Sequence, residues 1–243
     1  MARMKVVSLA TSIFILSAAQ VWAQLLPVPR LNVSSSAGIF SDQVNFSLGT
    51  NPDKFTVDVL ANMGGALEAR TNTGDLLGIF EDLQFSYNRE PFVEVIFTFR
   101  SVTDATVSLD TGILNIPAIN NAIGQAEAQI TFESNDGGIL SGLFPGPKAY
   151  QARYNETSLV TGDVFTNLVD DLSVVGSGSV TNAENEPRTA IPGVVTSLIG
   201  EFNFDITAGE TATGEALFTV IPEPASLALL ALGGIVFIGR RRG

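Results

Sequence analysis

The sequence contains neither cysteine nor histidine. No disulfide can form, so an exported form of this chain must be held together by its hydrophobic core alone. The two absences also exclude thiol nucleophiles, Cys/His zinc sites, haem bound through histidine, and Ser-His-Asp triads. Carboxylates are therefore the catalytic groups that remain to be considered.

Basic residues are scarce: 13 lysines and arginines stand against 25 aspartates and glutamates, for a net charge of −12. Two of the basic residues lie in the first 23 residues and three at the extreme C-terminus, where one glutamate also lies. The 196 residues between these ends keep eight basic and 24 acidic residues, a net charge of −16. Phosphate backbones would be repelled by such a body, so nucleic acid is not expected as a partner.

The N-terminus has the layout of a secretory signal peptide. Arg3 and Lys5 form a basic region, an apolar stretch follows to about residue 19, and Val21-Trp22-Ala23 places small or slim residues before a cleavage site. We predict export by the Sec machinery and cleavage between Ala23 and Gln24. An uncleaved membrane anchor is the alternative, disfavoured because the apolar run is short. The single tryptophan, Trp22, would be lost on cleavage.

The C-terminus combines a Pro-Glu-Pro step (Pro222, Glu223 and Pro224), an uncharged run over residues 225–239, and a basic end formed by Arg240, Arg241 and Arg242. As a helix the run would span roughly 22 Å, against about 30 Å for the hydrocarbon core, so it predicts a short transmembrane helix. Arginines at its end would stay cytoplasmic, which places the acidic body outside. Both ends of the chain therefore predict the same topology.

Residues 220–243 resemble the PEP-CTERM sorting signal, a tail also catalogued as an ice-binding protein C-terminal domain. The resemblance covers about a tenth of the chain. It implies an exported protein of a Gram-negative-type bacterium that makes exopolysaccharide, held at the membrane at least transiently and then placed at the cell surface or in the extracellular matrix. It also implies an exosortase-type membrane enzyme that recognises Pro222, Glu223 and Pro224. A plain C-terminal anchor, with prolines that merely end the last strand, is the alternative.

The body, residues 24–219, repeats short β-rich runs separated by Gly, Asn, Asp and Ser. Several runs alternate apolar and polar residues, as one-sided strands do. They predict an all-β fold, an antiparallel β-sandwich. The expected strands cover residues 44–49, 55–60, 83–88, 92–100, 105–110, 128–133, 138–144, 148–155, 171–178, 198–207 and 214–221.

Three further segments complete the expected organisation of the body. Helical structure is expected near residues 116–123 and 165–168, and an exposed loop at 181–193. A split of the body into two domains near residues 119–125 is an alternative to one continuous sandwich. Ile199 breaks the alternation of its strand and predicts a β-bulge.

Acidic pairs such as Asp170-Asp171 are expected by chance among 24 body acids, so no catalytic residue is assigned and the chain is not expected to be an enzyme. Calcium is the one cofactor that the acidic composition favours, because exported acidic β-sandwiches often bind it through loop carboxylates. The weak candidates are Asn135, Asp136, Asp170 and Asp171. None lies in an EF-hand-type loop.

Sugar-binding surfaces use exposed aromatic rings, and the mature chain would contain no tryptophan. Tyr150 and Tyr154 lie four residues apart on one face of an expected strand and form the one candidate platform, although packing within the sheet is the simpler interpretation. The first functional hypothesis is thus a non-catalytic adhesive or structural protein. A carbohydrate- or calcium-binding module is the second, and a hydrolase with two acids in a shared cleft, one with a raised pKa, is the third.

Overall fold

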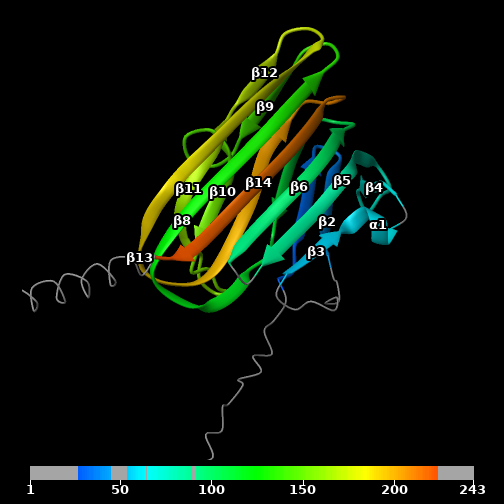
Figure 1. Cartoon of the computed structure of the whole chain (residues 1–243). Coiled ribbons are helices and arrows are strands. Elements are labelled where there is room, and N and C mark those ends of the chain that lie inside the picture. The colour runs from blue at the N-terminus through cyan, green and yellow to red at the C-terminus, as the bar shows by residue number, and fades with distance from the viewer. Residues whose placement is uncertain (1–26, 45–53, 64, 89–90, 224–243) are drawn as a thin grey trace, which may run out of the picture.

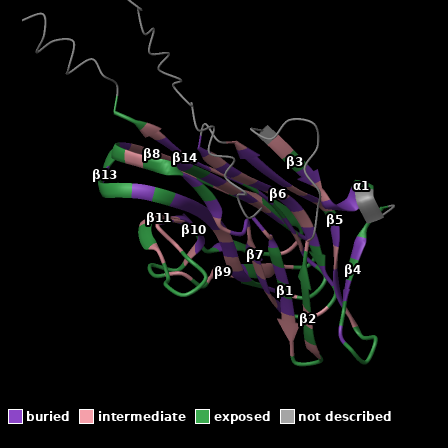
Figure 2. Cartoon of the chain, turned by 90° about the horizontal axis from the view of Figure 1, so that it is seen from below, coloured by how far each residue is buried: buried purple, intermediate pink, exposed green. Residues whose placement is uncertain are grey.

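The computed structural model describes residues 27–44, 54–63, 65–88 and 91–223. These residues form one antiparallel sheet of 14 strands that folds over on itself into two layers (Figures 1 and 2). The all-β, antiparallel expectation is confirmed. The two layers belong to one continuous sheet rather than two separate ones, because a single strand, β13 (Gly178–Ile206), runs through both.

The first layer pairs neighbours in the order β3, β5, β6, β14 and β8, ending on the N-terminal half of β13, with β4 also paired to β5. Its strands are β3 Lys54–Asp58, β4 Leu67–Arg70, β5 Leu76–Asn88, β6 Phe92–Ser101, β14 Thr211–Pro222 and β8 Leu114–Ser134. The described helix, α1 (Val59–Met63), is five residues long and follows β3.

The second layer is built around the C-terminal half of β13, which pairs with β7 on one side and with β9 and β10 on the other. Outside these, β1 and β2 follow β7, β11 pairs with β10, and β12 pairs with β9. The strands of this layer are β1 Arg30–Ser35, β2 Gly38–Gln43, β7 Ala105–Asp110, β9 Gly138–Gly142, β10 Lys148–Tyr154, β11 Asp163–Asp170 and β12 Leu172–Val174.

Strand β13 passes from one layer to the other through a bend. Its register against β8 shifts three times between Glu186 and Ser197, and Gly193 within this segment has a positive φ of 80°. Each shift leaves a residue without a direct partner and increases the local twist, which turns the strand toward the second layer. The predicted bulge at Ile199 is wrong in position, since the irregularities of this pairing end at Ser197.

Several sequence-based expectations for the body are corrected by this architecture. The helical segments expected at 116–123 and 165–168 lie in β8 and β11, and the loop expected at 181–193 lies in β13. Strand β8 runs without interruption through residues 119–125. The strand expected at 44–49 lies almost wholly outside the described residues. The N-terminal half of β13 is polar and yet a strand, because it is largely solvent-exposed and pairs only with β8, so it needs no apolar face.

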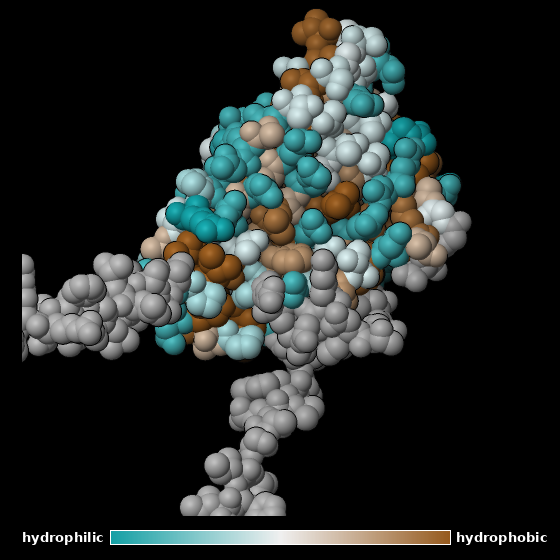
Figure 3. Space-filling model, viewed as in Figure 1, coloured by the Kyte–Doolittle hydropathy of each residue, from teal (hydrophilic) through white to brown (hydrophobic). Residues whose placement is uncertain are grey.

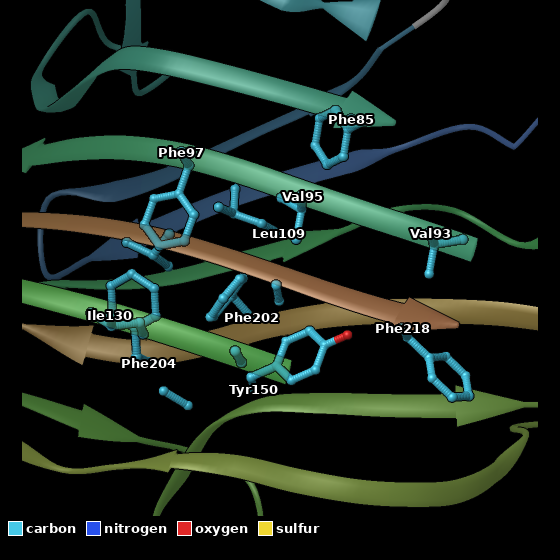
Figure 4. Packing of buried hydrophobic residues seen from close by; sticks show 14 of the residues in the cluster. Phe85, Val93, Val95, Phe97, Leu109, Ile130, Tyr150, Phe202, Phe204 and Phe218 are labelled. Carbon is cyan, nitrogen blue, oxygen red and sulfur yellow. The ribbon is translucent and has the colours of Figure 1, made fainter. Parts of the chain in front are cut away.

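The outer surface of the first layer is mostly hydrophilic, with scattered apolar atoms (Figure 3). Between the layers lies an apolar core in which phenylalanines from both sides meet (Figure 4). Phe97 from β6 packs edge-on against Phe202 at a ring-centroid distance of 5.0 Å, and it stacks on Phe204 at 5.8 Å. Phe165 and Phe218 join β11 to β14 at 5.1 Å. These rings hold the two layers together.

Candidate functional site

Four charged side chains lie on the outer face of the second layer, on neighbouring strands. Arg30 of β1 is opposite Asp110 of β7, and Asp110 is opposite Glu201 of β13. Arg153 of β10 lies across from Ile199, two residues before Glu201. Directly opposed residues of antiparallel strands point to the same side of the sheet, so Arg30, Asp110 and Glu201 form one row. Their sequence neighbours Leu31, Leu109 and Phe202 point into the core.

The row forms the floor of a cleft of about 520 Å³. Pro27 and Val28 line one side of it, and Glu156, Thr157 and Ser158, from the loop between β10 and β11, line another. The cleft is also lined by Gly112, Ile113, Asn115 and Ile199. We call it the Asp110–Glu201 cleft. It brings donors, acceptors and a few apolar groups together in one concave site.

Arg153 is the centre of the charge network in this cleft. Its Nη2 donates to Glu201 Oε2 at 3.0 Å, and its Nε lies 3.0 Å from Glu156 Oε2 in an ion pair whose angle is too bent for a hydrogen bond. The Arg153 and Glu201 side chains are only 15% and 17% exposed. Partial burial strengthens such pairs relative to surface ones and fixes the guanidinium in place.

Both carboxylates in the row have raised pKa values. Burial raises the pKa of Asp110, and the hydrogen bond from Gly112 N–H (2.8 Å) and the charge of Arg30 offset this in part. Burial likewise raises the pKa of Glu201, with Arg153 acting against it and the negative charge of Asp110 adding to it. Two acids that face each other in a cleft and share this direction of shift are typical of a functional site.

The raised pKa values predict how stability depends on pH. Because the folded state favours protonated Asp110 and Glu201, their contribution to stability is complete below the unfolded pKa values, roughly 3.9 and 4.3, and is lost as pH rises through the raised values. Asp110→Asn keeps an acceptor for Gly112 N–H and removes one titration. We expect the free energy of unfolding of the natural protein to fall relative to Asp110→Asn as pH rises from about 4, measured by urea denaturation. The assignment is contradicted if the stability of the natural protein relative to Asp110→Asn stays constant or increases as pH rises.

The two tyrosines that are the weak candidate for a sugar platform pack inside the fold instead, which is the simpler interpretation of the sequence. Tyr150 is 1% exposed and Tyr154 is 8% exposed, and Tyr150 packs against Phe202 with ring centroids 5.0 Å apart. Burial raises the pKa of both tyrosines. The two rings do share one face of β10, as expected, but that face points into the core rather than to solvent.

The four calcium candidates do not converge. Asn135 and Asp136 lie in the exposed turn between β8 and β9. Asp170 pairs with Lys148 Nζ at 2.9 Å, a hydrogen bond that lowers its pKa, and Asp171 accepts a hydrogen bond from Gly142 N–H at 2.7 Å. Among the residues that the structure describes, no group of three or more Asp or Glu side chains is placed to hold a metal ion.

The Pro-Glu-Pro step begins inside the fold. Pro222 is the last residue of β14 and lies opposite Ala122, while Glu223 N–H donates to the carbonyl of Asn121 at 2.9 Å. The remaining tail predictions (Pro224, the transmembrane helix 225–239 and Arg240, Arg241 and Arg242) lie outside the described residues, as does the cleavage site at Ala23 and Gln24. Within the described ranges no helix is long and apolar enough to cross a membrane.

Sequence reasoning missed the Asp110–Glu201 cleft entirely. The acidic pairs that stand out in the sequence are adjacent in the chain. Asp110 and Glu201 are 91 residues apart and meet only through strand pairing. One signal was available: Arg153 is one of only eight basic residues in an acidic body, and its strand contains a second cation, Lys148, but no acid. Cations in such a strand indicate acidic partners on neighbouring segments.

Comparison with known proteins gives one match in the sequence. Residues 220–242 match the family model of the PEP-CTERM protein-sorting motif, which confirms the resemblance of the tail. Such a tail implies exosortase-dependent export. No curated protein matches the chain.

Two solved structures illustrate what the body is similar to. TmCBM61 in complex with beta-1,4-galactotriose is 11% identical with a TM-score of 0.27, over 53% of this chain and 71% of the other. Infectious bursal disease virus Gx strain is 11% identical with a TM-score of 0.28, over 79% of this chain and 56% of the other. Similarity at this level carries no argument about ligands, so the function of the body must be argued from its own cleft.

Proposed function

We propose that this chain is an exported, non-catalytic protein of the bacterial surface or extracellular matrix, and that its Asp110–Glu201 cleft binds exopolysaccharide. The PEP-CTERM tail supports delivery through the Sec machinery and an exosortase-type enzyme, with a transient stay at the membrane. The observation that carries the binding role is the cleft itself, where five charged side chains converge with hydroxyl and amide groups.

The chemistry of the cleft suits a polyhydroxylated ligand. Sugar hydroxyls both donate and accept hydrogen bonds, so they can donate to the carboxylates of Asp110 and Glu201 and accept from the guanidinium of Arg30. Asn115, Thr157 and Ser158 add neutral groups of both kinds. No aromatic side chain in the described ranges is among the exposed large hydrophobic residues, so Pro27, Val28 and Ile113 offer the apolar contacts for the faces of sugar rings.

The charges of the cleft favour a neutral glycan over an acidic one. Arg30 and Arg153 stand against Asp110, Glu156 and Glu201, and Arg153 is already engaged by two of these acids. The surrounding body carries a further excess of negative charge. An anionic polysaccharide would have to overcome this repulsion.

Binding is tested by affinity electrophoresis and calorimetry with purified neutral and acidic polysaccharides, including the exopolysaccharide of the producing cells. We expect Asp110→Asn to weaken binding of the neutral polymer about tenfold, since it removes a charged acceptor and leaves the fold intact. Asp205→Asn is the matched control, because Asp205 lies on the same face of β13 four residues further along and outside the cleft. Equal affinities for both variants and the natural protein would refute the proposal.

A hydrolase is the second candidate function, favoured by the facing carboxylates with raised pKa values. Opposed Cβ atoms of neighbouring antiparallel strands are about 4.5–5.5 Å apart, which allows a close pair of acids. Glycosidases of the retaining type hold their carboxyl groups at about 5–5.5 Å. Reducing ends released from the polysaccharide, and lost in both Asp110→Asn and Glu201→Gln, would establish this function and overturn the non-catalytic one.

A further inference from the structure

One end of the molecule gathers several segments that are distant in sequence. Glu223 bonds to Asn121 of β8, and the preceding residue, Asn120, lies opposite Val194 in the bend of β13. Asn155 Nδ2 donates to the carbonyl of Val194 at 2.8 Å, and Asn155 Oδ1 accepts from Thr196 N–H at 2.9 Å. The end of β14, the bend of β13 and the β10–β11 loop thus form one surface, which we call the tail end.

The tail end exposes apolar side chains. Leu159 is 92% exposed, Val160 61%, Val164 50% and Val194 41%. Apolar atoms also gather on this end in the space-filling view, beside the point where the chain continues past Glu223 (Figure 3). Other exposed aliphatic residues of the described body, such as Ile39, Ile139 and Val175, lie on other segments, whereas these four lie in the β10–β11 loop, the start of β11 and the bend of β13. Several exposed aliphatic residues on adjoining segments are typical of a surface that another surface covers.

The loop that presents Leu159 and Val160 is held in a defined turn. Thr157 N–H donates to the carbonyl of Val160 at 3.0 Å, and Val160 N–H donates to Thr157 Oγ1 at 3.0 Å. Ser197 Oγ donates to the carbonyl of Glu156 at 2.7 Å, which ties the loop to β13. A turn ordered in this way projects its two apolar side chains outward and loses little conformational freedom on contact with another surface.

The position of the tail identifies what this surface meets. The uncharged run of residues 225–239 begins two residues after Glu223, and two residues of extended chain reach at most about 7 Å. Once this run enters a membrane, Glu223 is held within that distance of it, and the tail end is the part of the body beside the bilayer. The tail that links the body to the membrane therefore makes lipid the nearest partner for Leu159 and Val160.

We propose that the tail end is a lipid-docking surface, on which the β10–β11 loop inserts Leu159 and Val160 into the membrane interface while the tail is anchored. The inference rests on the insertion of the tail that the proposed function requires. Four exposed aliphatic side chains bind a bilayer weakly by themselves, but the tether supplies a high effective concentration. Because Thr157 and Ser158 also line the Asp110–Glu201 cleft, docking holds this wall of the cleft at the membrane until the tail is cleaved.

The test uses the mature chain from Gln24 to Gly243, which contains no tryptophan, so that one introduced tryptophan is the sole fluorophore of its kind. Leu159→Trp reports on the tail end. Val175→Trp is the control, because Val175 is fully exposed in the turn between β12 and β13, at the opposite end of the molecule (Figure 1). Each variant is reconstituted into phosphatidylcholine vesicles with or without brominated acyl chains, and flotation measures anchoring separately. We expect brominated lipid to lower the emission of Leu159→Trp about twofold, with a blue shift, and to leave Val175→Trp unchanged.

Anchored chains in which both tryptophans respond equally, or in which neither responds, overturn the docking proposal and leave the anchoring intact. Chains that do not float with the vesicles overturn the anchoring and the docking together. Polysaccharide binding is measured in the absence of vesicles, so a failure of the glycan proposal is distinguished from either result.

Discussion

Cells that produce the chain with Pro222→Ala, Glu223→Ala and Pro224→Ala are expected to retain it in the membrane with its C-terminus at Gly243. The natural chain is expected to appear in the medium or on the cell surface with a new C-terminus near residues 222–224. The difference is close to all-or-none, because these three residues are the motif that the exosortase-type enzyme would recognise. Intact mass of the protein from the envelope and medium fractions measures it directly.

The structure adds a constraint to this experiment. Pro222 lies in the ladder opposite Ala122, and Glu223 N–H bonds to Asn121, so the enzyme must recognise the motif at the end of a central strand of the folded sheet. Glu215→Ala is a suitable control, since Glu215 lies in the same strand on the outer face and outside the motif. A natural chain that ends at Gly243 and occurs only in membranes would contradict the sorting role and leave a simple anchor.

Phe97→Ala is expected to remove about 3–5 kcal/mol from the free energy of unfolding. Phe97 is fully buried and contacts Phe202 and Phe204 of the opposite layer, so its loss opens a cavity between the layers. Its ring also lies over Gly214 of β14, where an added Cβ would come within 2.4 Å of the ring. No disulfide compensates for the loss, since the chain has no cysteine. Urea denaturation of purified protein measures the change.

Val175→Ala is the control for this experiment, because its side chain is fully exposed and its effect should stay within about 0.5 kcal/mol. A loss below about 1 kcal/mol for Phe97→Ala would show that the layers do not depend on this contact. Such a result would place the main stabilisation elsewhere in the sheet.

The strands that sequence analysis predicted well are those with one buried face. In β6 and β7 buried and more exposed positions alternate without interruption, and the observed bounds differ from the expected ones by at most one residue. Alternation fails as a guide for β8 and β13, whose outer portions are polar, contain Pro117, Pro187 and Pro192, and are stabilised by pairing with each other. Pairing between segments some 60 residues apart leaves little local pattern in either one.

Functional features differ in the same way: some are local sequence motifs, and others form only through long-range strand pairing. Sorting signals are motifs of contiguous residues, so the sequence by itself identified the PEP-CTERM tail. The signal peptide is likewise a contiguous pattern, and it stays a prediction. A β-rich body without disulfides also followed from composition and alternation.

Only the tertiary structure brought together the residues of the proposed binding cleft. Asp110, Arg153 and Glu201 come from three strands, and their opposition depends on register, which a shift of one residue would invert. The tertiary structure also decided between the two interpretations of Tyr150 and Tyr154, which lie in the core, and joined the β10–β11 loop to the bend of β13 through Asn155 and Val194. These placements depend on long-range pairing and layer packing, whose determinants are spread over the whole chain.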